Sequence, residues 1–351
     1  MIPFFVAIFL LGLSSLATAA NFNQVFALTE LDYEWPSEAS RAQALRDGTF
    51  KPENVYPRYM AVYGTRLFLS LHKDEGIPVT LVSLPTSSAS PKLTPFPSRN
   101  MHGPGDCDKI EEAKGLEVDS VGRLWVLDQG SISSNCSAKL LIIDLANKDQ
   151  IKIIHRFPFR RWLHDLVLDE TPDGTFAYIT RSIEQNIVVF SLERNESWMV
   201  DTPGIRAYAI ALSPKDQEAR QLYLSEWNSN QQFSVSVAAL RNGTRTANLN
   251  PIGNWTAISS FRMLMDNHGT MYAAFFQENH IFSCNTSQPF QEQRFHQVAG
   301  VYTGLPFTFA LDQSGTFWMT VFDDKKKPRY RLLKATVGAK SYTFEASQVS
   351  E

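Results

Sequence analysis

Six segments of this chain repeat one pattern: an apolar strand, a tight turn and a second strand that carries an aromatic residue. They begin at Met60, Leu116, Leu166, Ile210, Met263 and Phe309, at intervals of 44 to 56 residues. Further strand patterns such as "KLLIIDL" and "IKIIHRF" lie between them. A unit of four short strands in about 45–55 residues is typical of a propeller blade. The repeats therefore predict an all-β fold, a six-bladed β-propeller with a central channel, formed as a single domain by residues 21–351.

The turns of these repeats share their chemistry. Four of them combine an aspartate with a glycine: Asp119 with Gly122, Asp169 with Gly174, Asp266 with Gly269, and Asp312 with Gly315. Aspartate accepts hydrogen bonds from turn amides and glycine adopts positive φ, so we interpret these pairs as structural and not as metal or catalytic sites. The same alignment predicts equivalent second strands for Trp125, Tyr178, Tyr223, Tyr272 and Trp318.

The N-terminus indicates export. Residues 1–20 combine a short apolar core with the small residues Ala17, Thr18 and Ala19, which fit a signal-peptidase site. The apolar run is too short for a comfortable membrane span, so we expect a signal peptide and a secreted, extracellular protein. The sequons predicted to be glycosylated are Asn195, Asn242, Asn254 and Asn285, whereas the sequon at Asn135 is weaker because it contains Cys136.

The three cysteines have different predicted roles. Cys107 and Cys136 flank the hairpin of one repeat, and in an oxidising compartment we expect a disulfide between them. Cys284 is left over, either buried and inert or available to another chain. Because no Cx2C spacing occurs, we predict no zinc site, and no other metal or cofactor is indicated.

The charge balance argues against two classes of partner. The chain has 33 Lys and Arg residues against 36 Asp and Glu residues, a formal net charge of -3. No global field therefore draws it to nucleic acid or to an anionic membrane. We expect a small molecule as its partner, and a monomer.

A series of motifs runs in order along almost the whole mature chain. They include "ELDYEWPSEASRAQALRDGTFKPENVYP", "GRLWVLDQG", "LYLSEWNSNQQFSVSVAALRN", "NHIFSCNTSQPF" and "GTFWMTVF". Together they resemble the yellow / major royal jelly protein family of secreted insect proteins. The resemblance implies a six-bladed propeller, in agreement with the repeats. It leaves the function open, because members include pigmentation factors, proposed dopachrome-converting enzymes, nutritive jelly proteins and salivary proteins that bind serotonin and catecholamines.

The last repeat departs from the amine-binding members of that family. Those members resemble W-x-x-S-N-R-x-F, in which the asparagine and a nearby phenylalanine touch the ligand. The stretch that begins here at Trp318 has Phe322 at the asparagine position and Asp323 at the arginine position. Thr308 corresponds to an upstream threonine contact. The comparison therefore implies that the asparagine hydrogen bond is lost at Phe322 and that Asp323 offers a charged partner beside it.

We predict that a small aromatic amine, such as serotonin or a catecholamine, binds at the channel mouth. Its ring needs an aromatic slot, and its ammonium needs an anion or an aromatic face. The candidate residues are Glu226, Trp227, Phe276, Phe307, Thr308, Phe322 and Asp323. The ring is expected among Phe276, Phe307 and Phe322, and the ammonium near Asp323 and Thr308.

Two alternatives stay open. A dopachrome-converting enzyme would use His164, Asp165 and His72 to move protons, although neighbouring His and Asp residues are more often a structural pair. No Gly-x-Ser-x-Gly elbow or nucleotide fingerprint occurs, so we name no catalytic residue. A structural or nutritive protein without a ligand site would have its channel mouth plugged by salt bridges, such as Asp128 or Glu226 with Arg181.

Overall fold

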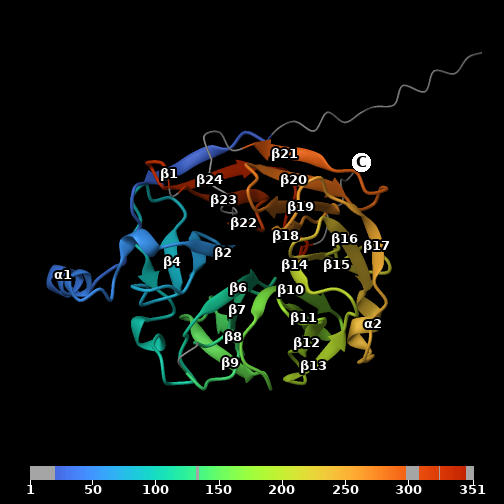
Figure 1. Ribbon diagram of the computed structural model, residues 1–351, viewed down its shortest axis with the longest axis horizontal. Helices are drawn as coiled ribbons and strands as arrows, with labels where there is room; N and C mark the ends of the chain where they lie inside the picture. Colours follow the sequence, from blue (N-terminus) through green and yellow to red (C-terminus); the bar gives the residue numbers. More distant parts are fainter. Residues whose placement is uncertain (1–19, 132–133, 298–307, 324, 345–351) are drawn as a thin grey trace, which may run out of the picture.

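Six four-stranded antiparallel sheets surround a central channel in the computed structural model, which describes residues 20–131, 134–297, 308–323 and 325–344 (Figure 1). The predicted six-bladed propeller is therefore confirmed. Residues 1–19 of the predicted signal peptide, and the candidate ligand residue Phe307, lie outside the described residues.

The blades follow one another along the chain. The first consists of β2 (Pro57–Tyr63), β3 (Arg66–Leu71), β4 (Leu81–Pro85) and β5 (Thr94–Pro95). The second consists of β6 (Ala113–Val118), β7 (Arg123–Asp128), β8 (Lys139–Asp144) and β9 (Gln150–Arg156). The third consists of β10 (Leu163–Thr171), β11 (Gly174–Arg181), β12 (Asn186–Ser191) and β13 (Glu196–Asp201). In each blade the first strand lines the channel, so the repeated hairpin is the inner half of a blade.

The remaining blades complete the ring. The fourth consists of β14 (Ala207–Leu212), β15 (Gln221–Glu226), β16 (Gln231–Ser236) and β17 (Asn250–Asn254). The fifth consists of β18 (Ser260–Met265), β19 (Thr270–Phe275), β20 (His280–Asn285) and β21 (Gln293–Gln297). The sixth consists of β22 (Thr308–Leu311), β23 (Thr316–Phe322), β24 (Tyr330–Thr336) and β1 (Asn23–Leu28). The helices are short: α1 (Glu38–Arg46), α2 (Val237–Arg241) and the 3-10 turns η1 (Pro52–Asn54) and η2 (Arg99–Met101).

The sixth blade differs from the repeat pattern, because its outer strand comes from the other end of the chain. Strand β1 pairs antiparallel with β24, with Phe26 opposite Leu332 and Leu28 opposite Tyr330. Figure 1 shows the two strands side by side at the edge of the ring. The N-terminal segment thus closes the propeller, and the two ends of the domain stabilise each other.

The aspartates before the turns explain why the aromatic residues are equivalent. Asp312 accepts hydrogen bonds from the backbone N–H groups of Ser314 and Thr316 and from Trp318 Nε1 at 2.8 Å. Equivalent side-chain bonds join Trp125 to Asp119, Tyr178 to Asp169 and Tyr272 to Asp266. The predicted equivalence is confirmed, since the five aromatic residues lie in β7, β11, β15, β19 and β23. The turn carboxylates are structural, as predicted.

Neighbouring blades pack through apolar side chains, and five hydrophobic clusters fill the spaces between them. Near the channel the inner strands approach closely. A Cβ atom at Gly115 would lie 2.9 Å from the Cα atom of Asp165 in the next blade. Glycine at this position therefore permits the contact between β6 and β10.

The covalent prediction is confirmed for the disulfide. Cys107 and Cys136 are bonded, with their Cα atoms 5.2 Å apart, and Cys284 is free and buried. The asparagines of all five sequons are exposed, and their glycosylation stays a prediction.

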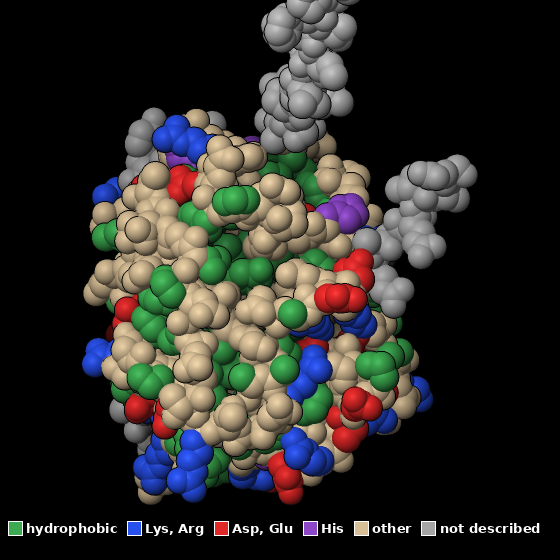
Figure 2. Space-filling view, turned by 90° about the vertical axis from the view of Figure 1, so that its right-hand side faces the viewer, with side chains coloured by type: hydrophobic (Ala, Val, Ile, Leu, Met, Phe, Trp, Pro, Cys, Tyr) green, Lys and Arg blue, Asp and Glu red, His purple; other side chains and the backbone are tan. Residues whose placement is uncertain are grey.

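Within the described ranges, no helix is long and apolar enough to cross a membrane. Figure 2 shows acidic and basic side chains interspersed on the side of the molecule formed by β17 and α2.

Candidate functional site

The two ends of the channel are different surfaces. We call the end where β2, β6, β10, β14, β18 and β22 begin the strand-start face. We call the opposite end, where each inner strand turns into the second strand of its blade, the hairpin face. The candidate ligand residues that the structure describes belong to the strand-start face, because they begin inner strands or lie at or just after the ends of second strands.

Aromatic side chains cluster at the strand-start face. The Tyr59 hydroxyl lies 2.7 Å from His164 Nδ1, and the His164 and Tyr208 ring centroids are 3.5 Å apart. Trp227 continues the series, with its centroid 4.7 Å from that of Tyr208 and 4.5 Å from that of Phe276. These rings form a continuous aromatic cluster, which we call the aromatic floor.

A recess of about 290 Å³ lies beside this floor, between the third and fourth blades. We call it the aromatic recess, and its lining residues are Ser182, Ile183, Arg206, Tyr208, Glu226, Trp227 and Asn228. Glu226 accepts a hydrogen bond from the backbone N–H of Arg206 at 3.3 Å and forms no ion pair with any residue that the structure describes. The recess thus offers two aromatic faces and a carboxylate free to bind a cation.

The predicted residues fall into two groups. Glu226 and Trp227 line the aromatic recess, and Phe276 packs against Trp227. Phe322 instead packs between the sixth and first blades, with its centroid 5.2 Å from those of Tyr56 and Tyr330. Among the described residues it makes no ring contact with Phe276. The Phe322 ring lies in the hydrophobic core between two blades, and Phe307 lies outside the described residues, so the aromatic slot expected among Phe276, Phe307 and Phe322 stays a prediction.

Thr308 and Asp323 are buried polar residues of the sixth blade. Thr308 begins β22 and is 1% exposed, and Asp323 follows β23 and is 2% exposed. Thr308 Oγ1 and Asp323 Oδ2 have no hydrogen-bond partner within the described residues. Burying a polar group without a hydrogen bond costs free energy, so we expect each of these two oxygens to bind a water molecule or a ligand.

The residues that a dopachrome-converting enzyme would use, His164, Asp165 and His72, are largely bound to other side chains. Asp165 is paired with Arg262, whose Nη1 lies 2.5 Å from both carboxylate oxygens. Burial, together with Arg58, Lys114 and Arg262, lowers the pKa of His164 well below its usual value, so the imidazole is neutral at pH 7. His72 Nδ1 lies 3.2 Å from Arg58 Nη1, away from Asp165 and His164 in the contacts described. These three residues do not form one proton-transfer unit.

The salt bridges expected of a plugged mouth are absent from the described residues. Asp128 is paired with Lys139 at 2.8 Å and accepts backbone hydrogen bonds from Glu111, Glu112 and Gly130. Arg181 lies 4.0 Å from the ring centroid of Phe159. Arg181 pairs with Glu184 at 3.7 Å, and within the described residues neither Asp128 nor Glu226 forms an ion pair with Arg181.

Unusual backbone conformations gather around the same face. Positive φ angles occur at five residues there that are not glycine: Arg161, Trp162, Asn228, Ser259 and Gln277. They precede β10 and β18 or follow β15 and β19. Non-glycine residues adopt positive φ only where their surroundings hold them, and such positions concentrate at ligand sites. These conformations make the third, fourth and fifth blades the candidate part of this face for a ligand site.

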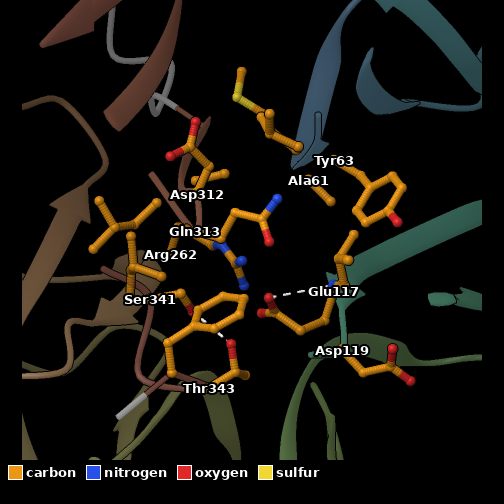
Figure 3. A pocket seen from close by; sticks show the side chains of 16 residues that line it. Ala61, Tyr63, Glu117, Asp119, Arg262, Asp312, Gln313, Ser341 and Thr343 are labelled. Carbon is orange, nitrogen blue, oxygen red and sulfur yellow. Dashed lines mark hydrogen bonds between the residues drawn. The ribbon is translucent and has the colours of Figure 1, made fainter. Parts of the chain in front are cut away.

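The hairpin face has a different cavity, which is shown in Figure 3. Its volume is only about 30 Å³, enough for one or two water molecules. Glu117 and Arg262 point into it, and Ser341 and Thr343 of the C-terminal segment cover it. Burial raises the pKa of Glu117 to about 7. This end of the channel is too small for an aromatic ligand.

The C-terminal segment holds the hairpin face closed. Ser341 bridges to Asp266, and the Tyr342 backbone N–H donates to Met265 O at 3.2 Å. The Tyr342 hydroxyl accepts a hydrogen bond from the Leu168 N–H at 2.7 Å. The segment that follows the sixth blade is thereby tied to the fifth and third blades.

Two residues of the strand-start face are not among the candidate ligand residues. Tyr208 lines the aromatic recess, in agreement with its sequence position at the start of an inner strand. Arg58 is the second residue of β2, and its guanidinium lies 5.6 Å from the Phe261 centroid on the other side of the channel. A search for an ammonium site draws attention to carboxylates and passes over such a cation.

No metal centre is found among the described residues, in which no group of three or more His, Cys, Asp or Glu side chains is placed to hold an ion.

Comparison with solved structures supports the fold. The chain resembles a luciferin-regenerating enzyme with a TM-score of 0.53 and 13% identity, over 85% of this chain and 96% of that one. It also resembles virginiamycin B lyase from Staphylococcus aureus with a TM-score of 0.50 and 13% identity, over 81% and 95% of the two chains.

Sequence comparison gives information about the family of the chain as well as about its fold. Protein yellow of Drosophila subobscura is 26% identical over 86% of this chain and 61% of its own length. Protein yellow of Drosophila melanogaster is 25% identical over 86% of this chain and 64% of its own length. The chain thus spans less than two thirds of these relatives. The model of the major royal jelly protein family matches residues 113–207 and 202–319, which is more than half of the sequence. The chain belongs to the yellow / major royal jelly protein family.

Proposed function

We propose that this protein is a secreted binding protein for a small aromatic amine, which it holds in the aromatic recess. Export is supported by the apolar N-terminal segment and by the disulfide between Cys107 and Cys136, since such bonds persist in oxidising compartments. The sequence relationship to protein yellow defines a family and leaves the ligand to be inferred from the site.

The observation that carries the proposal is the position of Glu226. Its carboxylate lies beside Trp227 and Tyr208 in the aromatic recess and has no ion-pair partner among the described residues. An ammonium group is attracted both to a carboxylate and to the faces of Trp and Tyr rings. A volume of about 290 Å³ lies at the small end of ligand pockets, which favours a ligand with one or two rings.

The proposed binding mode differs from the arrangement around Asp323. The ligand ring packs on Trp227 and Tyr208, with Phe276 supporting Trp227 from behind, and the ammonium binds Glu226. Asp323 is the competing anion, because one of its oxygens is unpartnered within the described residues. Its neighbour Phe322 fills the space between two blades, so access to Asp323 is poorer than access to Glu226.

Calorimetric titration with serotonin, dopamine and histamine tests the proposal. Serotonin and dopamine are expected to bind, and Glu226→Gln and Trp227→Ala are each expected to weaken binding by tenfold or more, about 1.4 kcal/mol. Asp323→Asn is expected to leave the affinity within twofold. Glu278→Gln is the matched control, because Glu278 lies in the equivalent turn of the next blade and away from the recess.

Three outcomes would contradict the proposal. No heat with any amine would favour a structural or nutritive protein. Loss of binding in Asp323→Asn but not in Glu226→Gln would move the ammonium to the sixth blade. Turnover of dopachrome that His164→Ala abolishes would replace the binding function by an enzymatic one.

A further inference from the structure

Arg58 extends over the mouth of the channel from the first blade. Its Nη1 lies 3.2 Å from His72 Nδ1, and its guanidinium lies 5.6 Å from the ring centroid of Phe261 in the fifth blade. It also lies close enough to the Tyr208 hydroxyl, in the fourth blade, to oppose the rise that burial causes in the pKa of Tyr208. A single cation thus reaches the wall of the aromatic recess from the opposite side of the mouth.

Arg58 has no carboxylate partner among the residues that the structure describes. Its Nε atom is buried and makes no hydrogen bond in that part of the chain. Two further polar groups at the starts of the first and sixth blades share this property, Tyr56 Oη and Thr308 Oγ1. Each of the three groups carries a hydrogen that it can donate. Buried donors without acceptors are rare in folded proteins and imply that an acceptor is missing.

The groups around Arg58 also carry positive charge that no described carboxylate near Arg58 balances. Burial and the nearby Arg58 and Arg161 lower the pKa of Lys114 to about 8, although Glu112 binds Lys114 at 2.6 Å. Burial, Arg58 and Lys114 lower the pKa of His72 as well. Glu112 is held by Lys114, and no described carboxylate approaches Arg58 within ion-pair distance. An anion bound at Arg58 would relieve the repulsion among these cations.

We propose that Arg58, with Tyr56 and Thr308, forms a carboxylate subsite that adjoins the aromatic recess. The ligand class is then an aromatic molecule with a carboxylate, whose ring occupies the recess that the proposed function assigns to the amine, and on which this inference rests. A guanidinium binds a carboxylate through directed N–H groups, and its free Nε–H supplies one of them. Tyr208 lines the recess and lies near Arg58, so we expect one small ligand to reach both sites.

Three phenolic ligands separate this inference from the proposed function. Tyramine carries only the ammonium, 3-(4-hydroxyphenyl)propionate only the carboxylate, and tyrosine both. We expect calorimetry to show that the propionate binds the wild-type protein and that Arg58→Gln weakens it tenfold or more. Tyramine is expected to keep or improve its affinity in Arg58→Gln, because a repelling charge has been removed, and to lose affinity in Glu226→Gln.

The control variant is Arg160→Gln, which removes an exposed arginine near the same face that hydrogen-bonds Asn135. It is expected to leave propionate binding within twofold, and thermal melting of each variant checks that it is folded. Failure of the propionate to bind the wild-type protein would overturn the subsite without any variant. Equal losses in Arg58→Gln and Arg160→Gln would also overturn it. Propionate binding that depends on Arg58, with no binding of tyramine, would retain the subsite and reject the amine.

Discussion

The hairpin face and the strand-start face are opposite ends of the same six inner strands, and they differ in whether their buried polar groups have hydrogen-bond partners. At the hairpin face, Asp119, Asp266 and Asp312 each bind turn amides and an aromatic side chain of the next strand. At the strand-start face, Arg58 Nε and Thr308 Oγ1 are buried without partners in the described residues. The turn carboxylates of these three blades have hydrogen-bond partners, whereas these two groups at the strand-start face have none among the described residues.

The backbone follows the same division. Several hairpin turns use glycine for positive φ, for example Gly122 and Gly315, although Ala219 does so in the fourth blade. Around the aromatic recess, positive φ angles occur at residues with side chains, such as Trp162 and Asn228. We therefore expect substitutions at the hairpin face to change mainly stability and substitutions around the recess to change mainly ligand binding. Substitutions at the two faces should separate these properties.

The largest effect is expected for Asp169→Asn at the hairpin end of the third blade. Asp169 is fully buried and binds Arg220, Arg241 and the Tyr178 hydroxyl. Loss of its charge leaves two arginines without their carboxylate, which should lower the free energy of unfolding by about 3–5 kcal/mol. Urea denaturation measures this, with the exposed Asp173→Asn of the same turn as control. If Asp169→Asn leaves the free energy of unfolding unchanged, or if its folded fraction loses ligand affinity, the two faces do not separate stability from binding.

A smaller, pH-dependent effect is expected for Glu117→Gln in the hairpin-face cavity. Burial raises the pKa of Glu117 from 4.5 to about 7, so the folded protein holds a proton that the unfolded chain has released. This contribution to stability is present below about pH 4.5 and is lost as the pH rises to 7, by at most about 3 kcal/mol. Glu117→Gln should flatten this part of the pH profile and be the more stable protein at pH 8. Parallel profiles for the two proteins from pH 4.5 to 8 would show that Glu117 ionises normally.

The smallest effect is expected for Tyr342→Phe in the C-terminal segment. The change removes the acceptor of the Leu168 N–H and should lower the free energy of unfolding by about 1–2 kcal/mol. Tyr63→Phe is the control, because the Tyr63 hydroxyl borders the same face and makes no hydrogen bond within the described residues. If both variants unfold at the same urea concentration as the wild type, the segment does not tie the blades together.

The blades could be predicted from the sequence because their determinants are local. An aspartate, a turn and an aromatic residue six to nine positions after the aspartate form a closed set of hydrogen bonds, as Asp119 and Trp125 or Asp169 and Tyr178 show. Strand β1 could not be recognised in the same way, because it has no hairpin of its own. Its pairing with β24 depends on the closure of the whole ring.

The site was predicted only in part, because position in a blade does not fix the direction of a side chain. Trp227 and Phe322 both lie at or just after the end of a second strand, yet Trp227 lines the recess and Phe322 packs between blades. Which of the two occurs depends on the neighbouring blade, here on Tyr56 against Phe322. Arg58 was missed because its role depends on Tyr208, which lies 150 residues away along the chain.

The most direct test of the account is a crystal structure of the protein soaked with serotonin. The account predicts electron density for the indole ring against Trp227 and Tyr208, with the ammonium within hydrogen-bond distance of Glu226. It also predicts an unchanged hairpin-face cavity, with Tyr342 still bound to Leu168. Density for the ligand at the hairpin face, or beside Asp323 with an empty aromatic recess, would contradict it.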